Sequence, residues 1–228
     1  SKQTDLINVT DAITVDGSNV GIGVAAPTAL LHIDGTNPNL VFGSSGNELT
    51  YLQRYNNDFY VFNKETSGSM LFGTANTERL RIDATGAVTM PAQPAFLAQP
   101  ASTQLNVGTS TTVTVVFGGE RFDQNADFAS NTFTAPVTGK YQLSYSLYLT
   151  NIDSAATYYE IYIQTSNRAY GFVIDPNFAS DLSYLTLTGS VLADMDASDT
   201  SYVSLRMQGG TAQTDIATPS YFSGYLVA

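Results

Sequence analysis

The chain of 228 residues contains no cysteine and no tryptophan, and it has a single histidine, His32. The absence of cysteine excludes disulfides and leaves no thiolate nucleophile. No apolar run approaches the roughly eighteen residues that a transmembrane helix needs, and no charged-then-apolar leader of the signal-peptide type is present. The sequence therefore predicts a chain that does not insert into a membrane.

Basic residues are also scarce. The chain has nine Lys and Arg against twenty Asp and Glu, which gives a formal net charge of −11. Only Arg79 and Arg81 lie close together in the sequence. Binding of a phosphate backbone needs clustered basic side chains, so we expect no nucleic-acid partner. An acidic surface suits a particle exposed to the medium, and it equally suits simple solubility.

Glycine, threonine, serine, tyrosine and phenylalanine are abundant, whereas lysine and glutamate are scarce. This balance disfavours helices and favours strands joined by tight turns, so the predicted fold class is all-β. The chain changes character at "MPAQPAFLAQP", where three prolines fall within eleven residues and exclude a helix. We therefore predict three parts: residues 1–90, a proline-rich neck at 91–100 and a domain at 101–228.

Residues 1–90 repeat a short pattern of apolar, any, apolar, Asp, in "ITVDGS", "LHIDGT" and "LRIDAT". Each copy predicts a short strand and an Asp-led turn, and two of them lead into a further strand, "NVGIG" and "AVTM". Between them, "FYVFNKETSGSMLFGT" predicts a hairpin that turns near Ser67 and Gly68. Such small hairpins bury little surface, so we expect several copies of this segment to wrap around a common axis as an elongated β-repeat stalk.

The second half contains seven longer segments with period-two alternation, which predicts strands with one face on a core. These segments are residues 112–117, 141–149, 158–164, 170–175, 183–193, 201–207 and 220–228. In the second of them, one predicted face carries Tyr141, Leu143, Tyr145, Leu147 and Leu149. Seven strands without a convincing helix predict a β-sandwich or jelly roll.

The stretch "FTAPVTGKYQLSY", residues 133–145, resembles the signature of the C1q/TNF-like superfamily. In that signature a Phe is followed six residues later by Gly and then by Tyr-x-Phe-x-aromatic, and Leu143 here replaces the usual second Phe. "LTGSVLADMDASDTSYVSLRM" and "YFSGYLVA" are similar to later strands of the family. Upstream aromatic and acidic positions of the pattern fall on Phe117, Asp123 and Phe128. The resemblance covers about residues 95–228 and implies a ten-stranded jelly roll that assembles as a homotrimer.

Residues 13–35 and 77–90, "GSNVGIGVAAPTALLHIDG" and "TERLRIDATGAVTM", resemble repeats of bacteriophage tail fibres and related bacterial surface fibres. This resemblance implies an elongated trimeric fibre segment. The two halves thus imply threefold assembly independently. We expect a virion fibre or spike on the particle surface, whose C1q-like head attaches to a host-surface glycan or protein.

The opening residues, "SKQTDLINVTDAI", are expected to be a natural start after removal of methionine and to dock into other virion proteins. Two alternatives to the attachment fibre remain open. The trimer can be a purely structural virion component, such as a capsid fibre or cement protein. It can also be a secreted bacterial C1q-like adhesin or glycan-binding module.

Residues suited to catalysis are few. A Ser-His-Asp triad would have to use His32, and no G-x-S-x-G context accompanies it. The densest acids, Asp194, Asp196 and Asp199, are candidates for a glycosidase carboxylate pair, but they lie where the family has an ordinary turn between strands. We therefore expect the protein not to be an enzyme.

One loop, "IDPNFASDLSY", offers Asp175, Asn177 and Asp181. Some C1q-like trimers hold calcium near their axis through aspartates of the corresponding loop, so the resemblance makes Asp175 and Asp181 calcium candidates. The alternative is an Asp-Pro turn that closes a hairpin. Apart from this calcium, no cofactor is expected.

Tyrosine is enriched in the second half, with eleven of its fourteen copies after residue 140. On one predicted strand, Tyr158 and Tyr162 fall on the face opposite Tyr159, Ile161 and Ile163, so the tyrosines cannot all fill the core. Outward-facing tyrosines can line a trimer interface or a carbohydrate-binding face, and both interpretations remain open. The candidates for such a surface are Tyr148, Tyr158, Tyr162, Tyr170 and Tyr184.

Overall fold

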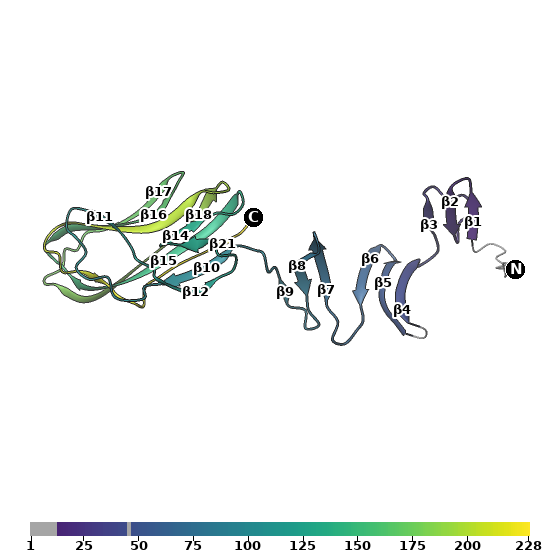
Figure 1. Ribbon diagram of the computed structural model, residues 1–228, viewed down its shortest axis with the longest axis horizontal. Coiled ribbons are helices and arrows are strands. Elements are labelled where there is room, and N and C mark those ends of the chain that lie inside the picture. Colours follow the sequence, from purple (N-terminus) through teal and green to yellow (C-terminus); the bar gives the residue numbers. More distant parts are fainter. Residues whose placement is uncertain (1–12, 45–46) are drawn as a thin grey trace. The chain divides into compact units, whose positions relative to one another are not determined.

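The computed structural model describes residues 13–44 and 47–228, and within these ranges every regular element is a strand (Figure 1). Accordingly, no helix of the described residues is long and apolar enough to cross a membrane. The chain divides into two compact units, Ser1–Met90 and Pro91–Ala228. The first twelve residues, predicted to dock into other virion proteins, lie outside the described residues.

The N-terminal unit contains three separate three-stranded sheets. Their strands are, in order, β1 (Ile13–Asp16), β2 (Asn19–Ile22) and β3 (Leu31–Ile33); β4 (Asn39–Ser44), β5 (Asn47–Tyr55) and β6 (Asp58–Asn63); β7 (Met70–Thr74), β8 (Thr77–Ile82) and β9 (Val88–Thr89). All neighbours pair antiparallel except β2 and β3, which are parallel.

The Asp-led turns predicted from the repeats are present. Asp16 ends β1, and Gly17, at φ 60°, carries the chain back into β2. After β8, the Asp83 Oδ1 atom accepts hydrogen bonds from the Thr85 amide, the Thr85 hydroxyl and the Ala87 amide at 2.8, 2.7 and 3.0 Å. These donors lower the pKa of Asp83 and fix the turn that leads into β9.

The hairpin predicted between residues 59 and 74 is wrong. β6 pairs with β5 and β7 pairs with β8, so the turn at Ser67 and Gly68 joins two sheets. The hairpin turns lie instead at residues 56–57 and 75–76, where Asn56, Ala75 and Asn76 adopt positive φ. Two-residue loops with positive φ match the twist of antiparallel strands, whereas the longer stretch at 64–69 does not impose a register.

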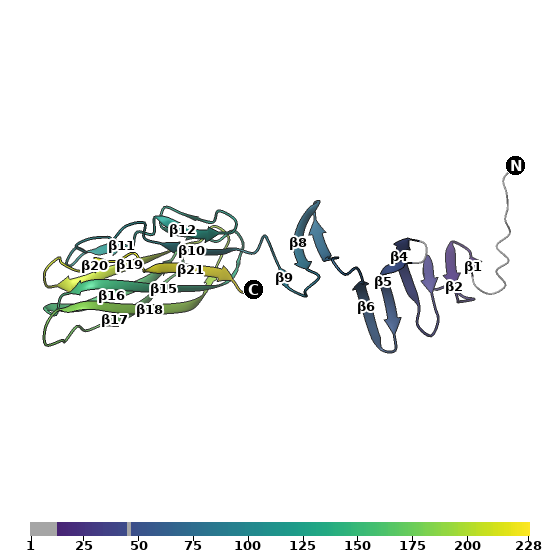
Figure 2. The ribbon, with the colours of Figure 1, turned by 90° about the horizontal axis from the view of Figure 1, so that it is seen from below.

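The C-terminal unit is a sandwich of two six-stranded sheets that lie face to face (Figures 1 and 2). The β15 sheet has the order β12-β10-β21-β15-β18, with β20 paired to β15. Its strands are β10 (Ala95–Gln99), β12 (Gly119–Asp123), β15 (Gly139–Ile152), β18 (Leu182–Met195), β20 (Asp215–Ile216) and β21 (Tyr221–Leu226).

The opposite layer, the β16 sheet, has the order β13-β14-β19-β16-β17, with β11 paired to β19. Its strands are β11 (Thr112–Thr114), β13 (Phe128–Ala129), β14 (Thr132–Thr134), β16 (Ala156–Thr165), β17 (Ala169–Ile174) and β19 (Thr200–Gly209). All strand pairs within the two sheets are antiparallel, as expected for a jelly-roll sandwich.

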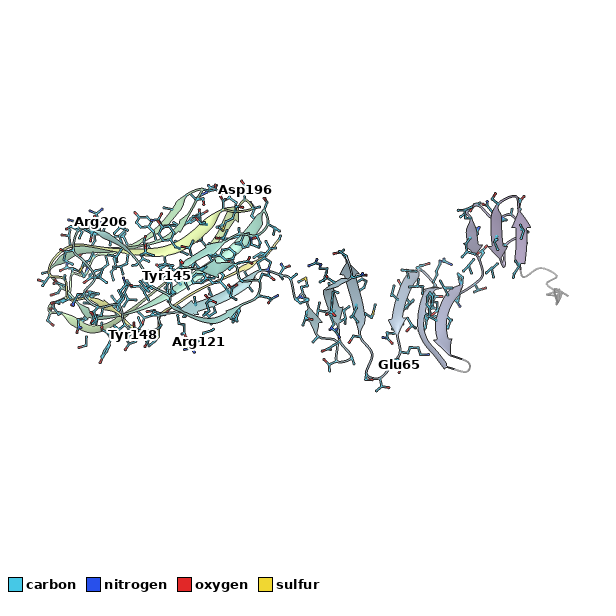
Figure 3. All side chains as sticks on the ribbon, in the orientation of Figure 1. Glu65, Arg121, Tyr145, Tyr148, Asp196 and Arg206 are labelled. Carbon is cyan, nitrogen blue, oxygen red and sulfur yellow. The ribbon has the colours of Figure 1, made fainter. Side chains whose placement is uncertain are left out.

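The core lies between these two sheets. The inward face predicted for residues 141–149 is confirmed, because its five side chains are fully buried. Figure 3 shows Tyr145 of this strand inside the sandwich. At one end an aromatic cluster joins the layers: the Phe96 ring of the β15 sheet lies 5.0 Å from Phe128 and 4.8 Å from Phe133 of the β16 sheet. The strands therefore bury a continuous apolar interior.

The separate neck predicted at residues 91–100 needs correction. Residues 95–99 form β10, an internal strand between β12 and β21, and Phe96 is buried in the core. Pro94 and Pro100 flank this strand rather than interrupt it, and the Pro94 carbonyl accepts a hydrogen bond from the Leu226 amide at 3.1 Å. Proline cannot donate to a sheet, but at strand ends it leaves the ladder intact.

The Tyr145 hydroxyl is buried in the core and has no hydrogen-bond partner among the described residues. Burial accordingly raises the pKa of Tyr145. The ring packs over Gly189, where a Cβ atom would lie 2.5 Å from the Tyr145 Cε1 atom. The glycine of the "GSV" motif therefore provides the space that this buried tyrosine occupies.

We predict that Tyr145→Phe raises the free energy of unfolding of the C-terminal unit by about 1 kcal/mol, because it removes an unpaired buried hydroxyl. Denaturant unfolding followed by circular dichroism measures the change. The matched control is Tyr141→Phe, since the Tyr141 hydroxyl donates to the Val137 carbonyl at 2.7 Å, and its loss should lower the free energy of unfolding by about 1 kcal/mol. Equal losses in the two variants would contradict the prediction.

Candidate interaction surfaces

The predicted outward tyrosines occupy two different faces of the sandwich. Tyr148 and Tyr184 lie on the outer face of the β15 sheet, with ring centroids 5.8 Å apart. Tyr158 and Tyr162 lie on the outer face of the β16 sheet, because they alternate with core residues of β16. Figure 3 shows Tyr148 and Arg206, which marks the β16 sheet, on opposite sides of the sandwich. The four tyrosines therefore do not form one surface.

Tyr170 was expected on such an outward surface, and this prediction is wrong. Its partner across the β16–β17 pair is Ile163, which is fully buried, so the two side chains share the inner face. Tyr170 packs against the core, and burial raises its pKa. The register of the hairpin through residues 166–168 decides this orientation, and the alternation within residues 170–175 does not reveal it.

On the outer face of the β15 sheet, strands β10, β21, β15 and β18 carry no charged side chain over their central part, whereas the charged Glu120 and Arg121 belong to the edge strand β12. Lys140 and Asp194 form a facing pair at one end of this face, and Asp215 pairs with Thr150 at the other. Between these ends the strand register places partly or fully exposed Ala95, Leu97, Gln142, Ser144, Ser146, Tyr148, Tyr184, Thr186, Thr188, Ser190, Leu192, Tyr221, Ser223 and Tyr225. We call this set the uncharged face; small hydroxyl and aromatic side chains of this kind can be buried against a partner at low desolvation cost.

The outer face of the β16 sheet differs, because it carries charges that are hydrogen-bonded within the sheet. Glu160 of β16 faces Arg206 of β19 in the register. The Tyr162 hydroxyl donates to the Glu160 Oε1 atom at 2.6 Å, and this bond raises the pKa of Tyr162. The Arg206 Nη2 atom donates to the Gln208 Oε1 atom at 2.7 Å. Such a face suits solvent or a polar ligand better than a dry interface.

The calcium candidates lie after β17, where Asp175 is exposed and Asp181 is held by neighbours. The Asp181 Oδ1 atom accepts hydrogen bonds from the Ser154 amide at 2.9 Å and the Ser154 hydroxyl at 2.7 Å, and its Oδ2 atom accepts one from the Gln213 Nε2 atom at 2.8 Å. These donors lower the pKa of Asp181 to about 2. Both oxygens of the Asp181 carboxylate already accept hydrogen bonds from N–H or O–H donors. A calcium ion would need these oxygens as ligands, so the arrangement does not fit calcium. Within residues 13–44 and 47–228, no group of three His, Cys, Asp or Glu side chains is placed to hold a metal.

Asp181 leads to a pH prediction. Its folded pKa lies below its ordinary value of 3.8, so the ionised carboxylate stabilises the folded state above that value, and this stabilisation is lost as the pH falls toward about 2. Asp181→Ala should therefore lower the unfolding midpoint at pH 7 by more than at pH 2. Thermal melts across this range measure the difference. A mutational effect that does not change with pH would contradict the role assigned to the carboxylate.

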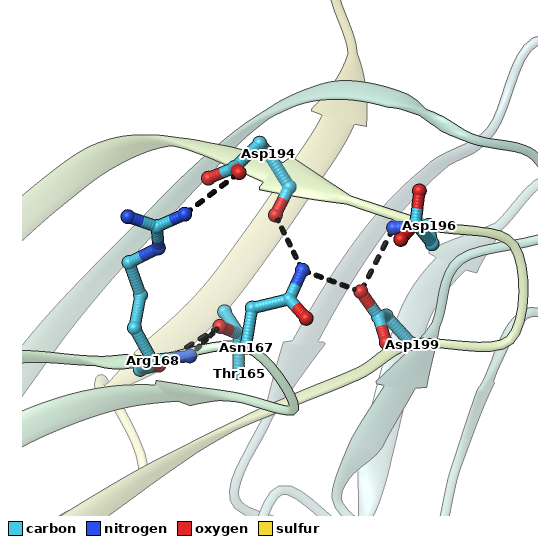
Figure 4. A network of polar contacts seen from close by, with 6 residues as sticks. All are labelled: Thr165, Asn167, Arg168, Asp194, Asp196 and Asp199. Atoms are coloured by element: carbon cyan, nitrogen blue, oxygen red, sulfur yellow. Dashed lines mark hydrogen bonds and ion pairs between the residues drawn. The ribbon is translucent and has the colours of Figure 1, made fainter.

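The three clustered acids each have local structural partners (Figure 4). Asp194 forms an ion pair with Arg168 at 2.8 Å. The Asp199 Oδ2 atom accepts hydrogen bonds from the Asn167 Nδ2 atom and the Asp196 amide, both at 2.8 Å. These contacts connect the β18–β19 turn to the β16–β17 turn, so the acids hold two loops together. The acids lie at a turn between strands, as the sequence predicted.

His32 lies far from these acids in sequence, on β3 of the N-terminal unit. Its Nδ1 atom accepts a hydrogen bond from the Thr28 amide at 3.3 Å, which closes the bend that precedes β3. This contact gives the histidine a local structural role.

Comparison with known proteins identifies the C-terminal unit. The C1q domain family matches residues 95–227, more than half of the chain. Among solved structures, the globular domain of the zebrafish complement 1qA protein is 17% identical, with 60% of this chain and 98% of that chain covered and a TM-score of 0.46. Murine APRIL, crystallised at pH 8.5, is 8% identical, with 59% and 99% covered and a TM-score of 0.43. No curated protein sequence matches the chain. The protein belongs to the C1q domain family.

Proposed function

We propose that the protein is a homotrimeric virion fibre of a bacteriophage, in which the N-terminal unit forms the stalk and the C1q domain forms the head that attaches to the host cell. The observation that carries this proposal is the exposed apolar surface of the N-terminal unit. Apart from Pro27, every buried hydrophobic side chain that the structure describes belongs to the C-terminal unit. The N-terminal unit instead exposes Ile13, Val15, Ile22, Leu30, Leu31, Leu40, Phe42, Leu52, Tyr55, Phe59, Val61, Phe62, Leu71, Phe72, Val88 and Met90.

The β4-β5-β6 sheet shows why a single copy is insufficient. One of its faces carries the row Leu40, Leu52 and Val61, all exposed. Its other face carries Tyr60 and Phe62, whose rings stack at 5.3 Å. An isolated three-stranded sheet with apolar residues on both faces is unstable in water, so further copies of this chain must cover at least one face.

Membership of the C1q domain family supports three copies, because the resemblance to this family implies a homotrimer. The uncharged face of the β15 sheet is the surface best suited to join them, since no charge has to be desolvated there. This leaves the hydrogen-bonded outer face of the β16 sheet to solvent. A trimeric head would also hold the stalk strands of three chains in register.

Attachment by such a fibre would be multivalent and non-enzymatic. Three weak sites on one head, repeated over several fibres on a particle, gain avidity through effective concentration. In this proposal the N-terminal region docks into other virion proteins and the head contacts a host-surface glycan or protein. Neither calcium nor another cofactor takes part.

Two measurements test the proposal. Light scattering should give a trimer mass for the full chain and for residues 91–228, whose core is complete within that segment. Fluorescently labelled full-length protein should bind cells of at least one species in a panel of bacteria and compete with phage adsorption there. A monomeric full chain would refute the fibre. A trimer found at fixed copy number in particles but unable to bind cells would favour a structural virion component.

A further inference from the structure

The Tyr162 side chain lies flat on the outer face of the β16 sheet. Its register partner on the edge strand β17 is Gly171, and a Cβ atom at that glycine would lie 2.6, 3.1 and 3.2 Å from the Cε1, Cδ1 and Cζ atoms of the Tyr162 ring. The ring therefore occupies the space that any other residue at position 171 would fill. One ring face rests on the β17 backbone and the opposite face points away from the sandwich, which is why Tyr162 is only partly buried.

Polar groups surround this ring. Its hydroxyl is fixed by the 2.6 Å hydrogen bond to Glu160 Oε1, which prevents the ring from swinging off the sheet. Only one of the two Glu160 oxygens is used in this bond, and Glu160 faces Arg206 on the neighbouring strand β19. Tyr158 lies on the same face, four residues along β16, which is about 13 Å along a strand. The face thus presents the Tyr162 ring in a fixed position, the Glu160 carboxylate as an acceptor and the Tyr158 ring in one row along β16. The Arg206 guanidinium on β19 adds hydrogen-bond donors beside Glu160.

We propose that this row, Tyr158, Glu160, Tyr162 and Arg206, is a binding site for a neutral oligosaccharide, with the Tyr162 ring as the platform on which one pyranose ring stacks. The inference rests on the proposed attachment function and names its ligand class and its place on the head. A pyranose ring has an apolar C–H face that packs on an aromatic ring and hydroxyls at its edge that donate and accept hydrogen bonds. Glu160 accepts from such hydroxyls and Arg206 donates to them.

The charge of the chain selects a neutral saccharide over an acidic one. The formal net charge is −11, and the row itself contains a carboxylate beside its one guanidinium. A polyanionic glycan would therefore be repelled both by the overall field and by Glu160. The length of the row, with tyrosines at two separated positions, fits an oligosaccharide better than a single sugar.

The experiment uses full-length protein on a printed array that carries neutral hexose and N-acetylhexosamine oligosaccharides beside sialylated and uronic-acid glycans. The wild-type protein should bind a subset of the neutral glycans. Tyr162→Ala should lower the apparent affinity roughly tenfold or more, because the stacking contact is lost at every site of a multivalent head. Tyr162→Phe keeps the ring and should stay within about threefold. Gly171→Ala keeps the ring but displaces it from the sheet, so it should weaken binding as Tyr162→Ala does.

Thermal melts and light scattering on the three variants confirm that fold and assembly are unchanged before binding is compared. Binding of neutral glycans that is equal in wild type and Tyr162→Ala would overturn the site while leaving attachment intact. Binding only to acidic glycans would overturn the proposed ligand class. Binding to cells without binding to any arrayed glycan would also overturn it, and would indicate a protein receptor. Failure to bind both cells and array would refute the attachment function itself.

Discussion

Phe133→Ala is expected to lower the free energy of unfolding of residues 91–228 by about 3–5 kcal/mol, the usual loss for a fully buried phenylalanine. Phe133 has no exposed surface, and it belongs to β14 of the β16 sheet. Its ring lies 4.8 Å from Phe96 and 5.4 Å from Tyr141, which both belong to the β15 sheet. The substitution therefore leaves a cavity where the two layers meet and removes contacts to both of them.

Denaturant unfolding at equal protein concentrations measures this loss, because the proposed assembly would make the midpoint depend on concentration. Phe133→Leu is the matched control: it keeps most of the apolar volume and should lower the free energy of unfolding by less than about 1.5 kcal/mol. A loss below about 1 kcal/mol for the alanine variant would show that this residue, which begins the family signature, does not hold the layers together.

Much of the C-terminal fold could be predicted because its strands are long enough to show their alternation. Each of the seven predicted segments is represented by a strand of the sandwich, although residues 112–117 shorten to β11. Five strands were missed. β13, β14 and β20 have two or three residues, too few to display a period, β12 has the sequence GERFD without apolar alternation, and β10 lies among prolines that indicate a linker. The reason for the glycine of the "GSV" motif is visible only in three dimensions, where the Tyr145 ring fills the space that a side chain at Gly189 would occupy.

The surfaces were less predictable than the strands, because they depend on pairing across loops. Alternation alone places Tyr162 outward correctly and Tyr170 outward incorrectly, since the register of the β16–β17 hairpin sets the second. The same register brings Gly171 under the Tyr162 ring, a contact that no local pattern reveals. In the N-terminal unit, a hairpin turn forms at Ala75 and Asn76, which adopt positive φ although neither residue is a glycine. Both wrong predictions, the outward Tyr170 and the hairpin at residues 59–74, therefore arose because the conformation of a turn was not predicted from the sequence.

Ser146→Asp is expected to convert the C-terminal unit from the proposed trimer into monomers. Ser146 lies at the centre of the uncharged face, paired with Tyr221 of β21 on one side and Thr188 of β18 on the other. If this face joins the copies, the substitution places an unpaired carboxylate in each of the contacts, at a cost of about 3–5 kcal/mol per buried charge. Light scattering on residues 91–228 should then report the monomer mass at pH 7.

The matched control is Thr112→Asp, which adds the same charge on the outer face of the β16 sheet opposite Arg206 and should leave the trimer intact. Lowering the pH to about 3, below the ordinary pKa of an aspartate near 3.9, should partly restore the Ser146→Asp trimer by neutralising the new carboxylates. Asp181, with its pKa of about 2, stays largely ionised at that pH, so its loop keeps its hydrogen bonds during the test. A Ser146→Asp variant that is trimeric at pH 7 would place the contact between copies on another surface, and the β16 sheet would then no longer be the face left for a glycan.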